Sequence, residues 1–301
     1  MADRTARRRH SAFAAGLATV AMALGFTAIP ADAAPPPGID YVALGDSYTA
    51  GTGAGTFPAL TPCIQTPGGY VDAVRETRRV NLVFNAACHG ALLTHDSKIE
   101  HDPRIPSVQQ QIDFLITSGA LTANTELVSI TAGANDVGVT GVLVTCLTQS
   151  PQACLAAVQD SATFFPKMQA DLVTALLEIH AAAPNAEIVV LGYPRLFDPT
   201  IPFAQVDPGV LSAINTAVDA LNDSIQAAVD NSGTGAVFVD VTNRFKGHAV
   251  NSDNPWIFFT APTISNGSLI FDPRNFHPNP AGHHAYSSAL RAAIKPGQLV
   301  R

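Results

Sequence analysis

The stretch around which the chain is organised reads Tyr41-Val42-Ala43-Leu44-Gly45-Asp46-Ser47-Tyr48. Its first four residues form an apolar run that fits a buried strand, and Gly45 allows the backbone to turn sharply where that strand ends. Ser47 then stands at the carboxyl end of a strand, which is where open α/β sheets bind their ligands. The plain alternative is a turn whose serine merely caps the following helix. Further polar sites, in the right order along the chain, favour a chemical role.

The first 33 residues have the pattern of an export signal. An arginine cluster between Arg4 and Arg9 precedes a run of small and apolar residues, and Ala31-Asp32-Ala33 offers small residues at both positions that a signal peptidase reads. A membrane anchor is the alternative, but the run is rich in Ala and Gly and is broken by Pro30. We therefore expect a signal peptide over residues 1–33, secretion by the Sec or the twin-arginine route, and a single domain over residues 34–301.

Composition and charge limit the possible partners. Without the leader, 268 residues remain, with 13 basic and 22 acidic side chains and a net charge of −9. This length suffices for one large α/β domain with a substantial core. A mildly acidic chain with few lysines argues against nucleic acid or an anionic membrane as the partner. We also expect no stable membrane insertion after signal cleavage, and a monomer.

The cysteine content agrees with export. Cys63, Cys88, Cys146 and Cys154 are even in number, and the oxidising space outside the cytoplasm favours disulfides. Cys146 and Cys154 are close enough in sequence to bridge one loop, which leaves Cys63 to pair with Cys88. This is the pairing we expect among the three possible ones. A zinc site is the alternative, but the chain has no C-x-x-C pair and no H-E-x-x-H motif.

Apolar runs recur along the chain with helical patterns between them. Near-continuous apolar runs are typical of parallel strands that are covered on both faces. One intervening helix is predicted to begin with a capping box of Ser107 and Gln110, followed by apolar residues at helical spacing. The pattern predicts an α/β fold, a doubly wound three-layer sandwich with a parallel sheet. The predicted strands are 39–45, 80–85, 126–132, 187–192 and 236–241.

The long connections all follow a predicted strand, so they meet at the same edge of the sheet as Ser47. They are residues 49–68, 89–106, 133–155, 193–207 and 242–280. Apolar and aromatic residues in the last two connections are expected to shape a pocket there, although packing of the loops against the core is the alternative for any one of them. These residues are Pro194, Phe197, Pro202, Phe203, Trp256, Ile257, Phe258 and Phe259.

Ester cleavage by a serine requires a hydroxyl, a base that takes its proton near neutral pH, and donors aimed at the oxyanion. Ser47 supplies the hydroxyl. His277 lies in Phe276-His277-Pro278-Asn279, just before the final predicted helix and after the last strand, and is the candidate base. Gly90 follows the second strand, where a glycine N–H approaches a ligand closely, and Asn135 follows the third. Ordinary turns are the alternative for each of the last two.

These blocks together resemble the SGNH, or GDSL, hydrolases. The resemblance rests on Gly-Asp-Ser-Tyr near the mature amino terminus, Gly90, Gly-x-Asn-Asp around Asn135, and the late His-Pro-Asn, which together cover almost the whole mature chain. The cysteine spacing looks like the secreted actinobacterial lipase and esterase branch. The resemblance implies a flavodoxin-like sandwich with five parallel strands and no metal or organic cofactor. It also implies that Ser47 is the nucleophile, that His277 is the base, and that Ser47, Gly90 and Asn135 form the oxyanion hole.

Three positions depart from that family pattern. Arg274 stands three residues before His277, where the family usually has an aspartate, so either Asp272 or a backbone carbonyl has to orient the histidine. His89 stands where a small hydroxyl residue is common. Asn251 replaces a cysteine of a third disulfide, so we expect a looser 242–260 loop.

We therefore predict a secreted serine esterase or lipase that hydrolyses acyl or lipid esters through an acyl-enzyme on Ser47. The substrate is a small-molecule or lipid ester. Two alternatives remain open: a carbohydrate acetyl esterase, and an inactive secreted binding protein on the same scaffold. The G-x-S-x-G elbow of ordinary α/β-hydrolases is absent, because Thr49 occupies the place of its second glycine.

Overall fold

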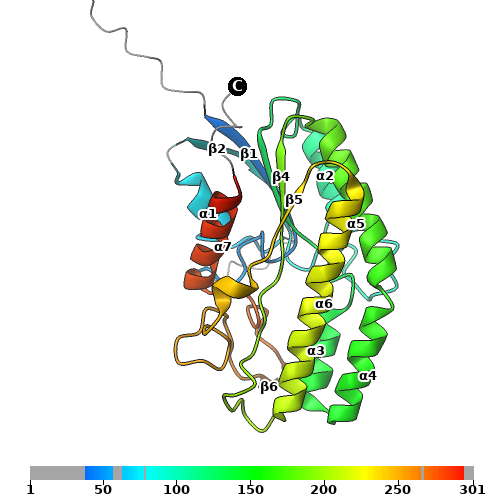
Figure 1. Cartoon of the computed structure of the whole chain (residues 1–301), viewed down its shortest axis with the longest axis vertical. Coiled ribbons are helices and arrows are strands. Elements are labelled where there is room, and N and C mark those ends of the chain that lie inside the picture. The colour runs from blue at the N-terminus through cyan, green and yellow to red at the C-terminus, as the bar shows by residue number, and fades with distance from the viewer. Residues whose placement is uncertain (1–37, 57–62, 78, 266–267, 295–301) are drawn as a thin grey trace, which may run out of the picture. The chain divides into compact units, whose positions relative to one another are not determined.

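A computed structural model shows that the predicted strands form one parallel sheet (Figure 1). The strand order is β2-β1-β3-β4-β5, and every neighbouring pair is parallel. The strands are β1 (Ile39–Gly45), β2 (Val80–Asn85), β3 (Leu127–Thr131), β4 (Glu187–Leu191) and β5 (Val237–Val239). The structure describes residues 38–56, 63–77, 79–265 and 268–294, all within one compact unit, Pro37–Arg301.

Helices cover both faces of this sheet, which confirms the three-layer α/β/α fold (Figure 1). On one face lie α1 (Tyr70–Arg75) and α7 (Pro280–Ala293), which pack against each other. On the other face lie α2 (Val108–Thr117), α5 (Phe165–Ala182) and α6 (Pro208–Ser232). The predicted capping box at the start of α2 is present, with both of its hydrogen bonds.

The central strands are buried on both faces because their side chains are almost all apolar. All five residues of β3 are buried, and six of the seven in β1. Strand β2 differs, since it lies at the edge of the sheet and leaves Val83 and Phe84 about two-fifths exposed, at 38% and 40%. The expectation of full cover therefore holds for the middle of the sheet and not for this edge.

Two of the predicted connections contain regular structure. Residues 133–155 hold α3 (Val139–Thr148) and the start of α4 (Pro151–Ala162), and the last long connection holds η1 (Thr242–Phe245) and an antiparallel hairpin of β6 (Thr263–Ser265) and β7 (Ser268–Ile270). Helix α3 was not predicted because six of the ten residues in its sequence, VTGVLVTCLT, are β-branched and one is glycine, a composition that does not favour a helix.

Both disulfides join the residues that the sequence paired. Cys63 is bonded to Cys88, and Cys146 to Cys154, which links α3 to α4. No cysteine is therefore available as a thiolate ligand for zinc. The predicted signal peptide lies outside the described residues, and among those that are described no helix is long and apolar enough to cross a membrane.

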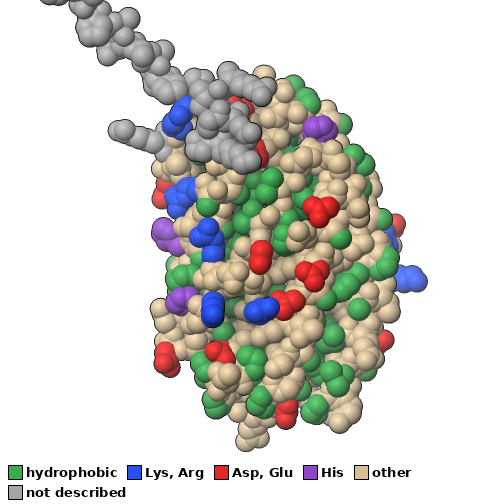
Figure 2. Space-filling view, viewed as in Figure 1, with side chains coloured by type: hydrophobic (Ala, Val, Ile, Leu, Met, Phe, Trp, Pro, Cys, Tyr) green, Lys and Arg blue, Asp and Glu red, His purple; other side chains and the backbone are tan. Residues whose placement is uncertain are grey.

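On the face shown in Figure 2 the Lys and Arg side chains lie mostly along the left side, the Asp and Glu side chains are scattered, and hydrophobic side chains reach the surface between them. The chain carries 24 acidic against 17 basic residues, yet the acidic ones gather in no large patch on this face.

Candidate active site

The turn after β1 is fixed by close backbone contacts. Gly45 has φ of +126°, and a side chain at this position would approach the carbonyl oxygen of Thr131 to 2.2 Å. The buried amide of Gln111 accepts a hydrogen bond from Gly45 N–H at 2.8 Å and donates one to Gly45 C=O at 3.0 Å. Strand β1 therefore ends in a rigid turn, and Ser47, which is 6% exposed, projects from it.

Asp46 anchors this turn from inside the protein. Its buried carboxylate accepts hydrogen bonds from Tyr193 Oη at 2.5 Å, Thr131 Oγ1 at 2.6 Å and the backbone N–H of Tyr48 at 3.0 Å. Burial raises the pKa of Asp46 to about 6, while these hydrogen bonds act in the opposite direction. The carboxylate therefore holds the backbone just after Ser47 through Tyr48 N–H, and none of these three hydrogen bonds involves the Ser47 hydroxyl.

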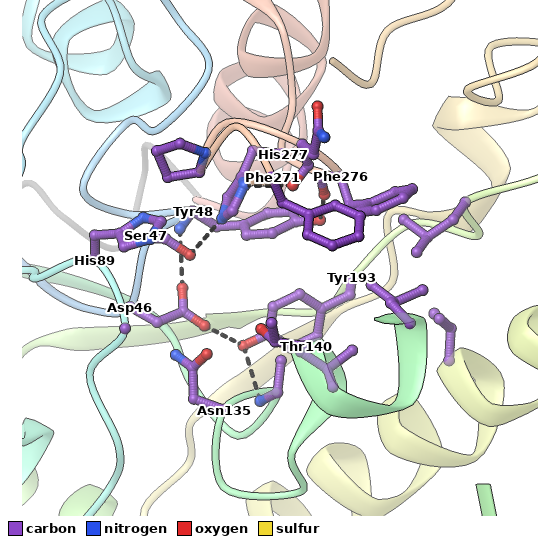
Figure 3. Close-up of a pocket in the computed structure, with 18 of the residues that line it drawn as sticks. Asp46, Ser47, Tyr48, His89, Asn135, Thr140, Tyr193, Phe271, Phe276 and His277 are labelled. Atoms are coloured by element: carbon purple, nitrogen blue, oxygen red, sulfur yellow. Dashed lines mark hydrogen bonds between the residues drawn. The ribbon is translucent and has the colours of Figure 1, made fainter. Parts of the chain in front are cut away.

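His277 and Ser47 are within hydrogen-bonding distance of each other although 230 residues separate them in the sequence. The distance between His277 Nε2 and Ser47 Oγ is 2.7 Å (Figure 3). On the other side of the ring, Nδ1 lies 3.0 Å from the backbone carbonyl oxygen of Asn275. A carbonyl only accepts, so Nδ1 carries the proton and Nε2 is left as the acceptor for the serine hydroxyl. This is the tautomer that a general base requires.

Asp272 does not contact His277. It makes a bidentate ion pair with Arg274, from Nε at 2.9 Å and Nη2 at 2.6 Å. The Arg274 guanidinium also lies 4.4 Å from the centre of the Phe258 ring, a cation–π contact. Of the two candidates that the sequence left open, the backbone carbonyl is therefore the group that contacts the imidazole.

The segment that carries this carbonyl is held at several points. The Asn275 side chain accepts from Thr260 N–H at 2.8 Å and donates to Thr260 C=O at 2.9 Å. Phe276 has φ of +64°, a strained conformation for a bulky residue, and its carbonyl accepts a hydrogen bond from Tyr48 Oη at 2.7 Å. Strain next to a candidate catalytic histidine, held by surrounding hydrogen bonds, is typical of functional sites.

Three histidines near the site have lowered pKa values. Burial and the neighbouring ring of His89 lower the pKa of His277 to about 3, so its imidazole is neutral at pH 7 and able to accept a proton. Burial lowers the pKa of His89 to about 4, and its ring centre lies 5.3 Å from that of His277. Burial also lowers the pKa of His283 to about 4. This residue donates a hydrogen bond to Thr52 C=O and accepts one from Tyr70 N–H, so it has a structural role in the core.

Gly90 and Asn135, the candidate hydrogen-bond donors, line the same pocket as Ser47. Gly90 has φ of +81°, a conformation that favours glycine, and lines the same pocket as Ser47. Among the described residues, no acceptor is bonded to the backbone N–H of Ser47 or of Gly90. The Asn135 amide donates one hydrogen to Ala91 C=O at 2.9 Å, which fixes its orientation and leaves its second N–H for another acceptor.

All four predicted site residues, Ser47, Gly90, Asn135 and His277, line one pocket of about 340 Å³. Of the aromatic and apolar residues that the sequence analysis placed near the pocket, only Pro194 lines it. The rings of Phe197, Phe203 and Phe259 instead pack against one another and against Phe276, in edge-to-face or tilted arrangements. The apolar wall comes instead from residues that the sequence did not single out. These are Val139, Leu143, Val144 and Leu147 of α3, Val218 and Leu221 of α6, and Leu196, Phe271 and Phe276.

The model of the GDSL-like Lipase/Acylhydrolase family matches residues 43–285, a span that contains all four site residues. The chain belongs to this family. As a GDSL-like hydrolase it is an enzyme that acts on acyl esters, and the late His277 and the Gly-Asp-Ser turn both lie inside the matched region.

The relatives of this GDSL-like hydrolase include curated Streptomyces lipases. The lipase of Streptomyces rimosus is 32% identical over 292 residues, which cover 95% of this chain and 98% of the relative. Lipase 1 of Streptomyces coelicolor is 31% identical over 290 residues, with 92% and 94% covered. Among solved structures, phospholipase A1 from Streptomyces albidoflavus NA297 superposes with a TM-score of 0.70 at 29% identity, over 86% of this chain and 100% of the other. The extracellular lipase of S. rimosus superposes with a TM-score of 0.67 at 27% sequence identity, over 85% of this chain and 100% of the other.

Asn251 occupies the place where the family often has a third disulfide. Its side chain accepts from Asp198 N–H at 2.9 Å and donates to the carbonyls of Asp198 at 2.8 Å and Ile201 at 2.6 Å. Three hydrogen bonds therefore connect the 242–260 loop to the segment after β4, where we expected a looser loop.

Proposed function

We propose that the protein is a secreted serine esterase or lipase in which Ser47 attacks the carbonyl carbon of an acyl ester. The observation that carries this proposal is the 2.7 Å contact between Ser47 Oγ and His277 Nε2, with Nδ1 bonded to the Asn275 carbonyl. His277 takes the hydroxyl proton as Oγ forms its bond to the carbonyl carbon. The tetrahedral oxyanion is stabilised by the N–H groups of Ser47 and Gly90 and by the Asn135 amide.

Collapse of the tetrahedral intermediate completes the first half of the reaction. The bond to the leaving alkoxide breaks, and the imidazolium of His277 returns its proton to that oxygen, so an alcohol departs and Ser47 remains acylated. A water molecule, deprotonated by His277, then attacks the acyl carbon, and the carboxylic acid leaves as the proton returns to Ser47. No metal or organic cofactor takes part in these steps.

The Asn275 carbonyl replaces the carboxylate of a standard triad in this proposal. The carboxylate fixes the tautomer and orientation of the histidine and stabilises the imidazolium, and a well-held carbonyl dipole performs the first two tasks fully and the third in part. The presence of Arg274 in place of the usual aspartate is therefore no argument for an inactive binding protein. A fluorophosphonate probe distinguishes an active enzyme from a binding protein, because it labels an active serine covalently and does not label a binding module.

The acyl part of the substrate is proposed to be an apolar chain. Away from Ser47 and His277 the pocket wall consists mainly of aliphatic side chains of α3 and α6 with Phe271 and Phe276, and Thr140, Asp272 and Asn275 are its polar members. This mainly apolar wall suits a hydrocarbon better than a sugar ring, which needs several polar partners. The relatives named lipase and phospholipase A1 agree with this class of substrate. Activity on fatty acyl esters, compared with an acetylated sugar, distinguishes a lipase from a carbohydrate acetyl esterase.

The direct test is Ser47→Ala, assayed on a short chromogenic ester. We expect turnover to fall to background with an unchanged melting temperature, because the serine hydroxyl makes its only described hydrogen bond to His277. Turnover near the wild-type rate would refute the mechanism. Secretion through residues 1–33 is tested by amino-terminal sequencing of the exported protein, which should begin at Ala34, and the monomer by its mass in solution.

A further inference from the structure

The pocket that contains Ser47 adjoins a second cavity of about 70 Å³. Both cavities are lined by the same set of side chains from α3, α6 and the segment after β4, so these side chains form a common wall. Within that wall Leu143 is 7% exposed and Leu221 3% exposed. The shared residues are Val139, Leu143, Leu196, Val218 and Leu221.

Helices α3 and α6 each present side chains to both cavities. On α3, Val144 and Leu147 line the Ser47 pocket, and Val142 lines the second cavity. On α6, Ala217 and Ala220 line only the second cavity. Thr140 of α3 also lines the Ser47 pocket, so the apolar wall has one polar member on this helix. Figure 1 shows α3 beside the lower part of α6.

The second cavity suits hydrocarbon and not water. Apart from Ser161, its lining consists of Val, Leu, Ile, Ala and Phe side chains. The Ser161 hydroxyl already donates to the Val137 carbonyl at 2.6 Å. The second cavity is about as open to solvent as the Ser47 pocket, but an ordered water finds few polar partners along its walls, so these walls favour an apolar group. In an apolar cavity of about 150 Å³ a benzene ring fits, so about 70 Å³ is room for roughly three carbon atoms.

We propose that the second cavity receives the end of a long acyl chain whose ester group lies at Ser47, with Leu143 and Leu221 forming the constriction between the two spaces. The enzyme then recognises long-chain acyl esters by two successive apolar sites, the Ser47 pocket and the second cavity. Short acyl chains end inside the first. This inference rests on the proposed function of Ser47, and it assigns the chain-length preference to residues that do not contact the reacting atoms.

The test fills the second cavity without touching the first. Ala220→Leu adds three carbon atoms to a position that lines only the second cavity, and Ala213→Leu, on the same helix and lining neither cavity, is the matched control. The substrates are p-nitrophenyl butyrate, octanoate, laurate and palmitate in the same mixed detergent micelles. Each methylene buried in an apolar site changes kcat/KM about fourfold, so losing three lowers the ratio of palmitate to butyrate activity by up to about sixtyfold.

We expect Ala220→Leu to lower kcat/KM for the long esters by on the order of tenfold or more, and to leave butyrate within about twofold of the wild type. Ala213→Leu should change neither. Ala217→Leu provides a second filling variant should Ala220→Leu fail to fold. Leu143→Ala widens the constriction and should raise the ratio of palmitate to butyrate activity severalfold.

An unchanged chain-length profile in both filling variants overturns the proposal, and so does an equal loss for all four esters. A ratio that stays constant or falls in Leu143→Ala has the same consequence. None of these outcomes affects the proposed role of Ser47, which fails only if Ser47→Ala still hydrolyses butyrate. The two proposals are therefore tested separately with the same series of esters.

Discussion

Replacing Asn275 by alanine should reduce catalysis by disturbing the orientation of His277. The Asn275 side chain makes two hydrogen bonds to the backbone of Thr260, and its own carbonyl is the acceptor for His277 Nδ1. Asn275 is only 7% exposed, so water does not readily replace the lost amide. The substitution leaves the carbonyl in place chemically but removes the side-chain contacts that fix its direction.

The structure gives the size of both effects. Two net hydrogen bonds at about 1 kcal/mol each put the loss of folding stability near 2 kcal/mol. A displacement of about 1 Å in a catalytic group costs on the order of a hundredfold in rate, so we expect kcat to fall by about ten- to a hundredfold. KM should change little, because the Asn275 amide bonds to the Thr260 backbone and not to the α3 and α6 side chains that are proposed to hold the acyl chain.

The assay pairs kinetics with urea unfolding and uses Asn251→Ala as the matched control. The Asn251 side chain likewise connects two segments, because it hydrogen-bonds from its own loop to the backbone of Asp198 and Ile201. None of these hydrogen bonds involves His277. We expect both variants to lose stability and only Asn275→Ala to lose kcat. If the two variants lose kcat equally, or if Asn275→Ala keeps the wild-type kcat, the positioning role is refuted.

Four further predictions follow from the site and the disulfides. Asn135→Ala should lower kcat on a short ester by about a hundredfold or more, because it removes one donor to the oxyanion; a loss below about threefold would exclude that role. Tyr193→Phe should lower the free energy of unfolding at pH 7 by about 1.5–3 kcal/mol, since a buried carboxylate loses a charge-assisted hydrogen bond; urea unfolding measures this. Because the pKa of His277 is lowered to about 3, the base stays neutral in mild acid, and kcat/KM at pH 5.5 should exceed about half its value at pH 7.5; a base of ordinary pKa 6.5 would leave about a tenth. Removing the Cys63–Cys88 disulfide, with a sequence separation of 25, should lower the free energy of unfolding by about 3.5 kcal/mol, and removing Cys146–Cys154, with a separation of 8, by about 2.5 kcal/mol. The variant without Cys63–Cys88 should therefore have the lower melting temperature, and the opposite order would contradict this prediction.

The fold was largely predictable because its signals are local. Each strand of the sheet is a short apolar run that ends in a small or polar residue, and each run was located to within one or two residues of the observed strand. Parallel strands place their carboxyl ends at one edge, so Ser47, Gly90 and Asn135 could be assigned to a common pocket from their positions in the chain alone. Helix α3 was missed because six of its ten residues are β-branched and one is glycine, which argues against a helix until tertiary packing decides.

The sequence by itself thus determined the sheet, the order of the polar strand ends and the identity of the hydroxyl and imidazole that meet in the pocket. Only the tertiary structure decided which group contacts His277 Nδ1 and which side chains form the apolar wall of the pocket. Every residue has a backbone carbonyl, so the acceptor at Asn275 has no signature in the sequence, and its direction depends on hydrogen bonds to Thr260 and Tyr48 from distant parts of the chain. The wall, likewise, exists only where α3 and α6 meet around a space that neither helix encloses alone.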